Sequence, residues 1–268
     1  MKFPDSGTPS EAVLSALRKG ANEDSPWHDR KMFIGGSYFG GQKVLDAANQ
    51  ASAIYQNHNA LYAGRAFPNL LNMERDIVSA LLDLFGASGS ATGNLTGGGT
   101  ESLLLTVQSA LNRARAEGRH APFELVIPEA AHPGFDKAAH LMGAVAKRIV
   151  DSRDYRADID AIRASVGNNT VLLAGSAPSY PFGVTDPIDD MAQVARDHRL
   201  WFHVDACHGG FVLPFAKDLG YSVPPFDFTV QGVTSLSVDL HKLGYANKGA
   251  SALLLSDSNN EDFQRYSF

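Results

Sequence analysis

Three segments, far apart along the chain, carry side chains suited to one kind of chemistry. Lys242 ends the strand-like run Thr234-Ser-Leu-Ser-Val-Asp-Leu-His-Lys242, and a lysine amine can form a Schiff base with an aldehyde. The glycine cluster Thr96-Gly-Gly-Gly-Thr-Glu-Ser102 precedes a predicted helix and offers backbone N–H groups to an anion. Asp205 ends the apolar run Trp201-Phe-His-Val-Asp205 and offers a carboxylate to a protonated ring nitrogen. Together, the amine, the anion cradle and the carboxylate predict a site for pyridoxal phosphate.

Each of these segments also has a purely structural interpretation. The glycine cluster could be a tight turn with Thr100 as the N-cap of the next helix, and its spacing fits neither the dinucleotide nor the P-loop motif. Asp205 could cap a helix or form a structural ion pair. Lys242 differs from an ordinary surface lysine such as Lys217 because it follows a strand and adjoins His241. We expect burial and nearby cations to lower the pKa of Lys242, because a catalytic amine must be neutral part of the time.

Two further side chains are weaker candidates for chemistry. His132 follows the strand-like run that ends at Pro128, and it is either a capping or core histidine or a residue that stacks on the cofactor ring and transfers protons. Cys207, the single cysteine, fits a small buried residue better than a nucleophile. The nearby His203 and His208 do not complete any known zinc spacing, so we expect no metal.

The composition narrows the class of protein. With 44% hydrophobic and 19% charged residues, the 268-residue chain is expected to be globular and not disordered. A net charge of −6 gives no basic surface for nucleic acid or an anionic membrane. We expect no signal peptide and no transmembrane segment, because no run of about eighteen apolar residues occurs. One cysteine allows no intramolecular disulfide and fits a reducing compartment such as the cytoplasm. The chemistry of pyridoxal phosphate predicts a small-molecule amine or amino-acid substrate.

Helix-like and strand-like segments alternate along the chain. One helix is predicted from apolar residues at spacings of three and four, namely Leu70, Met73, Ile77, Leu81 and Leu84. Helices are predicted at 10–19, 42–55, 69–85, 101–117, 136–142, 158–166 and 189–198, and strands at 124–128, 148–150, 170–174, 201–204, 234–238 and 250–255. This alternation predicts an α/β fold with a mostly parallel sheet flanked by helices. We expect an N-terminal helical segment at 1–65 and a cofactor-binding large domain at 66–268.

Several segments, in chain order, closely resemble the sphingosine-1-phosphate lyase group of the pyridoxal-phosphate-dependent (group II) decarboxylases. The two most specific are His203-Val-Asp-Ala-Cys-His-Gly-Gly-Phe211 and Ser237-Val-Asp-Leu-His-Lys-Leu-Gly-Tyr-Ala-Asn-Lys-Gly249. Weaker matches lie at 94–102, 132–138, 175–178 and 224–228. The resemblance extends from about residue 30 to the end of the chain.

This resemblance implies a fold and a set of roles. The fold is type I of the pyridoxal-phosphate-dependent transferases, which is aspartate aminotransferase-like, and its active sites usually lie at a homodimer interface. The implied catalytic residues are Lys242 as the Schiff-base lysine, Asp205 as the ring-nitrogen partner and His132 as the stacking residue. The implied neighbours of the cofactor phosphate are Gly98, Gly99, Thr100 and His241. Lys248 matches a second lysine that helps to bind an anionic substrate group.

The chain departs from the family pattern in two places. Family members continue into a smaller C-terminal domain, whereas this sequence ends at Phe268, so we expect that domain to be missing. In Asn59-Ala-Leu-Tyr62, a tyrosine stands where the lyases carry a histidine, which makes Tyr62 a candidate substrate-binding residue and leaves recognition of a phosphate headgroup open.

Three functions are compatible with these residues. The resemblance favours a carbon–carbon lyase that cleaves a phosphorylated 2-amino-3-hydroxyalkyl substrate by retro-aldol chemistry. An amino-acid decarboxylase is the second possibility, because the same cofactor serves both reactions and the orientation of the substrate selects between them. The third belongs to a different class: a truncated, inactive chain that serves as a scaffold for a full-length homologue.

Overall fold

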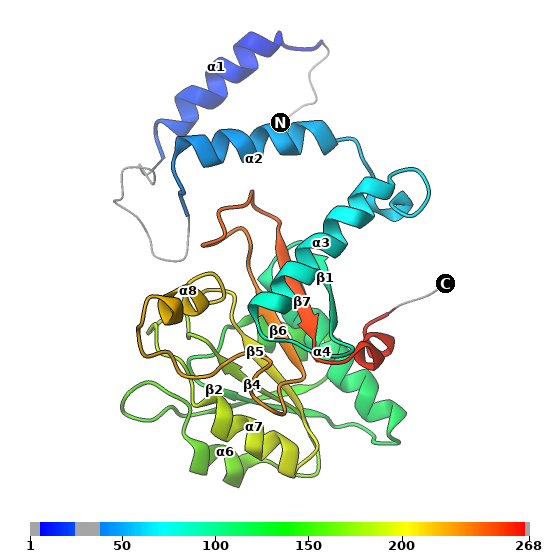
Figure 1. Ribbon diagram of the computed structural model, residues 1–268, viewed down its shortest axis with the longest axis vertical. Helices are drawn as coiled ribbons and strands as arrows, with labels where there is room; N and C mark the ends of the chain where they lie inside the picture. Colours follow the sequence, from blue (N-terminus) through cyan, green and yellow to red (C-terminus); the bar gives the residue numbers. More distant parts are fainter. Residues whose placement is uncertain (1–5, 25–37, 266–268) are drawn as a thin grey trace. The chain divides into compact units, whose positions relative to one another are not determined.

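The computed structural model describes residues 6–24 and 38–265 and divides the chain into two compact units, Met1–Phe39 and Gly40–Phe268. The first unit contains helix α1 (Ser10–Ala21), and the second contains the sheet and its helices (Figure 1). The helical segment that we expect at 1–65 spans this division, because α2 (Gln42–Tyr55) belongs to the second unit. No helix within the described ranges is long and apolar enough to cross a membrane.

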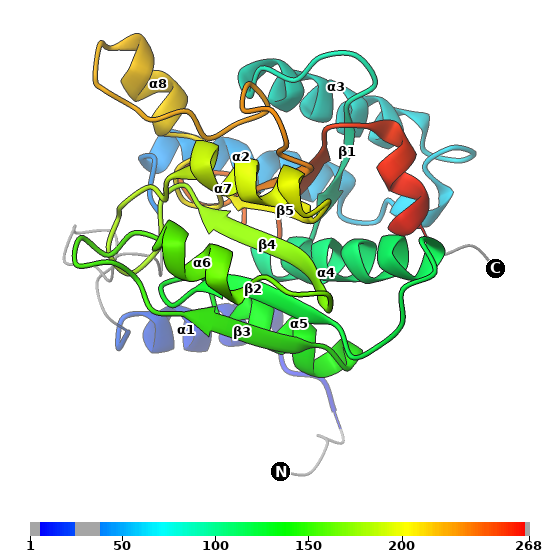
Figure 2. The same cartoon turned by 90° about the horizontal axis from the view of Figure 1, so that it is seen from below.

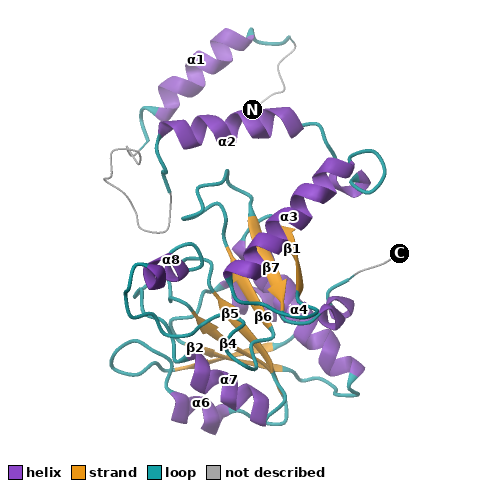
Figure 3. Cartoon of the chain, in the orientation of Figure 1, coloured by secondary structure: helices purple, strands orange, loops and turns teal. Residues whose placement is uncertain are grey.

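A seven-stranded sheet forms the centre of the second unit (Figure 3). Its spatial order is β1-β7-β6-β5-β4-β2-β3. The strands are β1 (Thr92–Thr96), β2 (Glu124–Pro128), β3 (Val145–Ile149), β4 (Thr170–Ser176), β5 (Trp201–Asp205), β6 (Ser235–Val238) and β7 (Ser251–Leu255). Strands β2 to β6 run parallel, and β7 pairs antiparallel with both β6 and β1. The predicted α/β fold with a mostly parallel sheet is therefore confirmed.

Helices connect these strands and cover both faces of the sheet. After α2 they are η2 (Ala60–Tyr62), α3 (Pro68–Leu84), α4 (Gly99–Ala116), α5 (Gly134–Met142), α6 (Ile159–Ser165), α7 (Ile188–Asp197), α8 (Leu213–Asp218) and η3 (Ser258–Phe263). Local chemistry sets several of their ends. Asp158 caps α6 by accepting a hydrogen bond from the N–H of Ala161 at 3.0 Å, and α5 ends at Gly143 in the left-handed conformation.

Two apolar cores lie on opposite faces of the sheet, because successive strand residues point to opposite sides. Figure 2 shows the helices that cover the sheet. Leu173 and Phe202 pack on one face with side chains of α3, α6 and α7. Leu172 and Trp201 pack on the other face with side chains of α4 and α5. A sheet covered on both faces leaves the ends of its strands for polar groups.

Three details of the secondary structure differ from the prediction. β1 was not predicted, because Gly93 and Asn94 have low strand propensity. Its pairing with β7 holds it in place as a strand. The two strands pack closely at Gly93, where an added Cβ would lie 2.8 Å from the carbonyl oxygen of Leu253. β3 begins three residues before the predicted strand, because it pairs with β2 from Val145 onward. The predicted apolar stripe of α3 is wrong at Met73, which is 36% exposed.

Two buried titratable groups give the fold opposing responses to pH. Burial lowers the pKa of His203 from 6.5 to about 4, so between those values the unfolded chain binds a proton that the folded protein does not. The contribution of His203 therefore lowers the free energy of unfolding as the pH decreases. Burial raises the pKa of Asp186 from 3.8 to about 6, although the N–H groups of Ser176 and Ala157 donate hydrogen bonds to its carboxylate. Between those values the folded protein holds a proton that the unfolded chain releases, and stability increases as the pH decreases.

We expect Asp186→Asn to reveal that the pH response of Asp186 offsets that of His203. An amide does not titrate, so the variant should lose about 2 kcal/mol more stability than the wild type between pH 7 and pH 4. Urea unfolding at both pH values measures this difference. Asp218→Asn is the matched control, because Asp218 is exposed and its variant should follow the wild type. Parallel pH profiles for Asp186→Asn and the wild type would contradict the assignment.

Candidate active site

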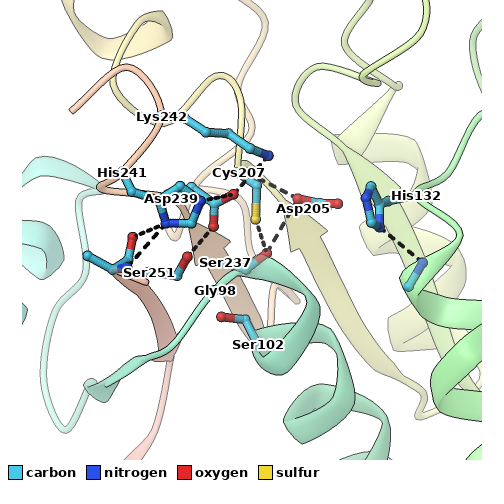
Figure 4. Close-up of polar contacts among 12 residues, drawn as sticks. Gly98, Ser102, His132, Asp205, Cys207, Ser237, Asp239, His241, Lys242 and Ser251 are labelled. Atoms are coloured by element: carbon cyan, nitrogen blue, oxygen red, sulfur yellow. Dashed lines mark hydrogen bonds and ion pairs between the residues drawn. The ribbon is translucent and has the colours of Figure 1, made fainter. Parts of the chain in front are cut away.

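The ends of β5 and β6 and the start of α4 bring the predicted site residues together. Asp205, the last residue of β5, pairs in register with Ser237 of β6. Lys242 lies in the turn that follows β6, and its amine points toward Asp239 and Cys207 beside Asp205 (Figure 4). Since parallel strands collect their carboxyl ends at one edge of the sheet, residues distant in sequence meet here.

Lys242 forms a buried ion pair. Its Nζ lies 2.8 Å from Oδ2 of Asp239, and the two side chains are 14% and 2% exposed. Burial lowers the pKa of Lys242, but Cys207, Asp239 and Asp205 together outweigh burial and raise this pKa above its ordinary value. The expectation that this pKa is lowered is therefore wrong, because the sequence did not indicate that a thiol and two carboxylates surround the amine.

Asp205 is a buried carboxylate with polar support. Its Oδ1 accepts a hydrogen bond from the N–H of Cys207 at 3.1 Å, and the hydroxyl of Ser237 lies 3.5 Å away. Burial opposes the charge of Asp205, but His203, the hydrogen bonds from Cys207 and the charge of Lys242 outweigh burial and hold its pKa below the usual range. A carboxylate that stays ionised in a buried place can stabilise a cation brought to it.

The glycine cluster forms the turn that starts α4. The helix begins at Gly99, its N-cap is Gly98 without a side-chain hydrogen bond, and Thr100 lies inside the first turn. The interpretation of Thr100 as an N-cap is therefore wrong. The first N–H groups of a helix have no acceptor within the helix, and together with the helix dipole they favour an anion. The ring of His241 lies 3.9 Å from the position that a Cβ of Gly98 would take.

The turn packs so closely that glycine is required at one position. A Cβ at Gly99 would lie 2.9 Å from Oδ1 of Asp239 and 3.0 Å from Sγ of Cys207. The N–H of Gly97 is already bonded to the carboxylate of Glu101 at 2.5 Å. The predicted anion cradle would therefore begin after Gly97, at the part of the turn that packs against Asp239.

His132 is fixed by its own turn. The N–H of Gly134 donates a hydrogen bond to Nδ1 of His132 at 3.0 Å, and the ring of Tyr180 meets the imidazole edge to face with centroids 5.5 Å apart. Because Nδ1 is the acceptor, a neutral His132 carries its proton on Nε2. The side chain is half-buried and lies near Asp205 in the close-up view (Figure 4). This geometry permits both the capping and the stacking interpretation.

The two predicted substrate-binding residues lie on exposed segments. Lys248 is exposed in the loop between β6 and β7. Tyr62 is 51% exposed and ends the short helix η2. Their roles remain predictions.

Sequence reasoning missed two residues that adjoin the lysine. Asp239 stands three residues before Lys242, within the run from Thr234 to Lys242, and a carboxylate at that spacing in a turn is the signal that could have identified it. His208 interacts electrostatically with Lys242, and its pKa is lowered chiefly by burial and then by the charge of Lys242. Within residues 6–24 and 38–265, no three histidine, cysteine or acidic side chains are grouped to hold a metal ion.

Residues 51–264 match the model of the pyridoxal-dependent decarboxylase conserved domain. The chain belongs to this family. The match includes Lys242, Asp205, His132 and the glycine turn, so the residues that meet in the structure lie inside the family domain.

Relatives within the family include sphingosine-1-phosphate lyases. The chain is 38% identical to that of Arabidopsis thaliana, over 96% of this chain and 47% of the relative. It is also 38% identical to sphingosine-1-phosphate lyase 1 of Rattus norvegicus, over 99% of this chain and 46% of the relative. A probable L-aspartate decarboxylase of Pyrococcus furiosus is 34% identical over 92% of this chain and 64% of the relative. The chain spans about half the length of the lyases that it matches.

Solved structures of the family share the fold. A sphingosine-1-phosphate lyase of Burkholderia pseudomallei superimposes with a TM-score of 0.90 at 36% identity, covering 98% of this chain and 62% of that chain. A glutamate decarboxylase of Lactobacillus brevis superimposes with a TM-score of 0.84 at 18% identity, covering 97% of this chain and 60% of that chain. The predicted type I fold is confirmed.

Pyridoxal phosphate is the cofactor of this family, and the site residues fit its three recognisable parts. Lys242 would provide an amine for the aldehyde, Asp205 would provide an ionised carboxylate for the ring nitrogen, and the turn at Gly98 and Gly99 would provide helix N–H groups for the phosphate. The close packing at Gly99, which leaves no space for a Cβ, supports a turn built around backbone groups.

Proposed function

We propose that this chain forms the cofactor-binding part of a carbon–carbon lyase that cleaves a phosphorylated 2-amino-3-hydroxyalkane. The proposal rests on the convergence of Lys242, Asp205 and the glycine turn at one sheet edge, in a chain 38% identical to sphingosine-1-phosphate lyases over nearly its whole length. In the cleavage, the bond between the amine-bearing and hydroxyl-bearing carbons breaks, the latter carbon leaves as an aldehyde, and a proton is added to the former. The reaction balances without an oxidant or reductant.

When bound, pyridoxal phosphate supplies a ring that accepts electrons from the carbon bearing the substrate amine. The side chains of the site have the chemistry that the proposed roles require. Lys242 holds the aldehyde and transfers protons through Nζ, and Asp205 keeps a proton at the ring nitrogen through its buried carboxylate. His132 stacks on the ring and holds a proton at Nε2, while Thr100 and His241 join the glycine turn in holding the phosphate.

The substrate-binding residues of the proposal are Lys248 and Tyr62. Lys248 provides a cation for an anionic group of the substrate, and it lies on the exposed loop between β6 and β7. Tyr62 provides a phenol at the position where related lyases carry a histidine, so it can donate a hydrogen bond but carries no positive charge at neutral pH.

Amino-acid decarboxylation is the second candidate function. It is supported by the 34% identity to a probable L-aspartate decarboxylase, of which the chain covers 64%. The same lysine, aspartate and glycine turn would serve this reaction, with a carboxylate leaving as carbon dioxide.

Product analysis distinguishes the two reactions. The purified chain, supplied with pyridoxal phosphate, is incubated with a long-chain phosphorylated 2-amino-3-hydroxyalkane or with L-aspartate, and aldehyde and carbon dioxide are both measured. We expect aldehyde and phosphoethanolamine from the first substrate and no carbon dioxide from the second. Carbon dioxide alone would replace the lyase proposal with the decarboxylase, and neither product would favour an inactive, scaffolding chain.

We further propose that two copies associate and that the protein acts in the cytoplasm. The homodimer is supported by analogy, because this fold usually places its active sites at a subunit interface. The location is supported by Cys207, a free, buried cysteine that fits a reducing compartment.

A further inference from the structure

We propose that Asp239 is the counter-ion of the free Lys242 amine and holds that amine beside the glycine turn whenever Lys242 is not bonded to the cofactor. Asp239 is thus a positioning residue that acts through Lys242. This inference rests on the proposed role of Lys242, but its test needs neither cofactor nor substrate.

The geometry of Asp239 is that of a fixed, buried acceptor. Its side chain is 2% exposed, Oδ2 lies 2.8 Å from Nζ of Lys242, and Oδ1 accepts a hydrogen bond from the hydroxyl of Ser251 on β7. Gly99 closes the space on another side, since a Cβ there would lie 2.9 Å from Oδ1. A carboxylate confined in this way cannot reach water easily, so it requires a cation.

Lysine has a long, flexible side chain, and an ion pair restricts it. A free Lys242 could adopt many rotamers, and fixing them costs conformational entropy. The contact with Asp239 keeps Nζ at the site instead (Figure 4). His241 also lies near the same carboxylate, with Nε2 3.9 Å from Oδ2.

The contacts around Lys242 identify Asp239 as its direct partner. The groups that act on the amine are Asp239, Asp205, Cys207 and His208. Burial raises the pKa of Cys207 well above its usual value, so its thiol is neutral at neutral pH. Of the two carboxylates, Asp239 contacts the amine directly and is hydrogen-bonded to it, whereas Asp205 acts through its charge alone.

Competitive labelling of the cofactor-free chain with acetic anhydride tests the proposal. Only a neutral amine reacts, so peptide mass spectrometry across a pH series gives the midpoint of reactivity for each lysine. In the wild type we expect Lys242 to have a higher midpoint than exposed Lys217, which serves as the internal reference. Asp239→Asn keeps the shape of the side chain but removes its charge, and it should lower the midpoint of Lys242 by at least about one pH unit.

Asp205→Asn is the matched comparison, because it removes the other carboxylate. We expect it to lower the midpoint of Lys242 by less than Asp239→Asn does, while neither variant moves Lys217. The proposal is overturned if Asp239→Asn leaves the midpoint of Lys242 in place or if Asp205→Asn has the larger effect. A wild-type midpoint for Lys242 at or below that of Lys217 would overturn it even if a variant failed to fold. Loss of lyase activity has no bearing on these readouts.

Discussion

Lys242→Arg is expected to abolish covalent attachment of pyridoxal phosphate and to reduce turnover by at least roughly 10³-fold, the scale of losing a covalent catalytic group. A guanidinium keeps the positive charge that Asp239 requires, but it does not lose its proton at any working pH and cannot form the Schiff base. Arginine is therefore a sharper test than alanine, which would leave the carboxylate of Asp239 buried without its cation. Borohydride reduction followed by mass spectrometry of the intact protein measures the attachment.

Lys217→Arg is the matched control for this experiment. It makes the same chemical change on the exposed helix α8, so both the mass gain after reduction and the turnover should equal those of the wild type. A reduced Lys242→Arg protein that still carries the cofactor mass would show that another amine is the attachment point, and the proposed site would then be wrong.

The sequence predicted those parts of the site that depend on order along the chain. Strand-like runs that end in Asp205 and approach Lys242 imply a shared sheet edge, because parallel strands align their carboxyl ends. The sequence did not predict the contact of Asp239 with Lys242, because both residues lie in a turn whose shape depends on packing against the glycine turn and Ser251. The direction of the pKa shift of Lys242 was wrong for the same reason.

The sheet shows the same contrast between local and long-range information. Strands rich in β-branched and aliphatic residues, such as β4, were recognisable from their own residues. β1 was not, because Thr92-Gly-Asn-Leu-Thr96 is stabilised as a strand by its pairing with β7, about 160 residues away in sequence. Periodicity describes what a segment can do alone, whereas register between distant segments depends on the whole chain.

Asp205→Asn is expected to preserve the fold but reduce turnover by roughly 10²-fold to 10⁴-fold, the range associated with a positioned proton-transfer partner. The amide oxygen can still accept the hydrogen bond from the N–H of Cys207, so the turn after β5 should keep its shape. The negative charge is lost, and with it the ability to keep a proton on a ring nitrogen brought to this place. Turnover, cofactor affinity and thermal unfolding should be measured together.

The matched control is Asp218→Asn, which neutralises an exposed carboxylate and should leave all three measurements unchanged. The combination of results distinguishes two roles for Asp205. If the residue were merely structural, Asp205→Asn would lower stability and turnover together. If Asp205 is instead the ionised partner of the ring nitrogen, its replacement should lower turnover and cofactor affinity, with little change in the unfolding temperature. If Asp205→Asn kept wild-type turnover, the carboxylate would be no more than a charged neighbour of Lys242, and the proton at the ring nitrogen would need another acceptor.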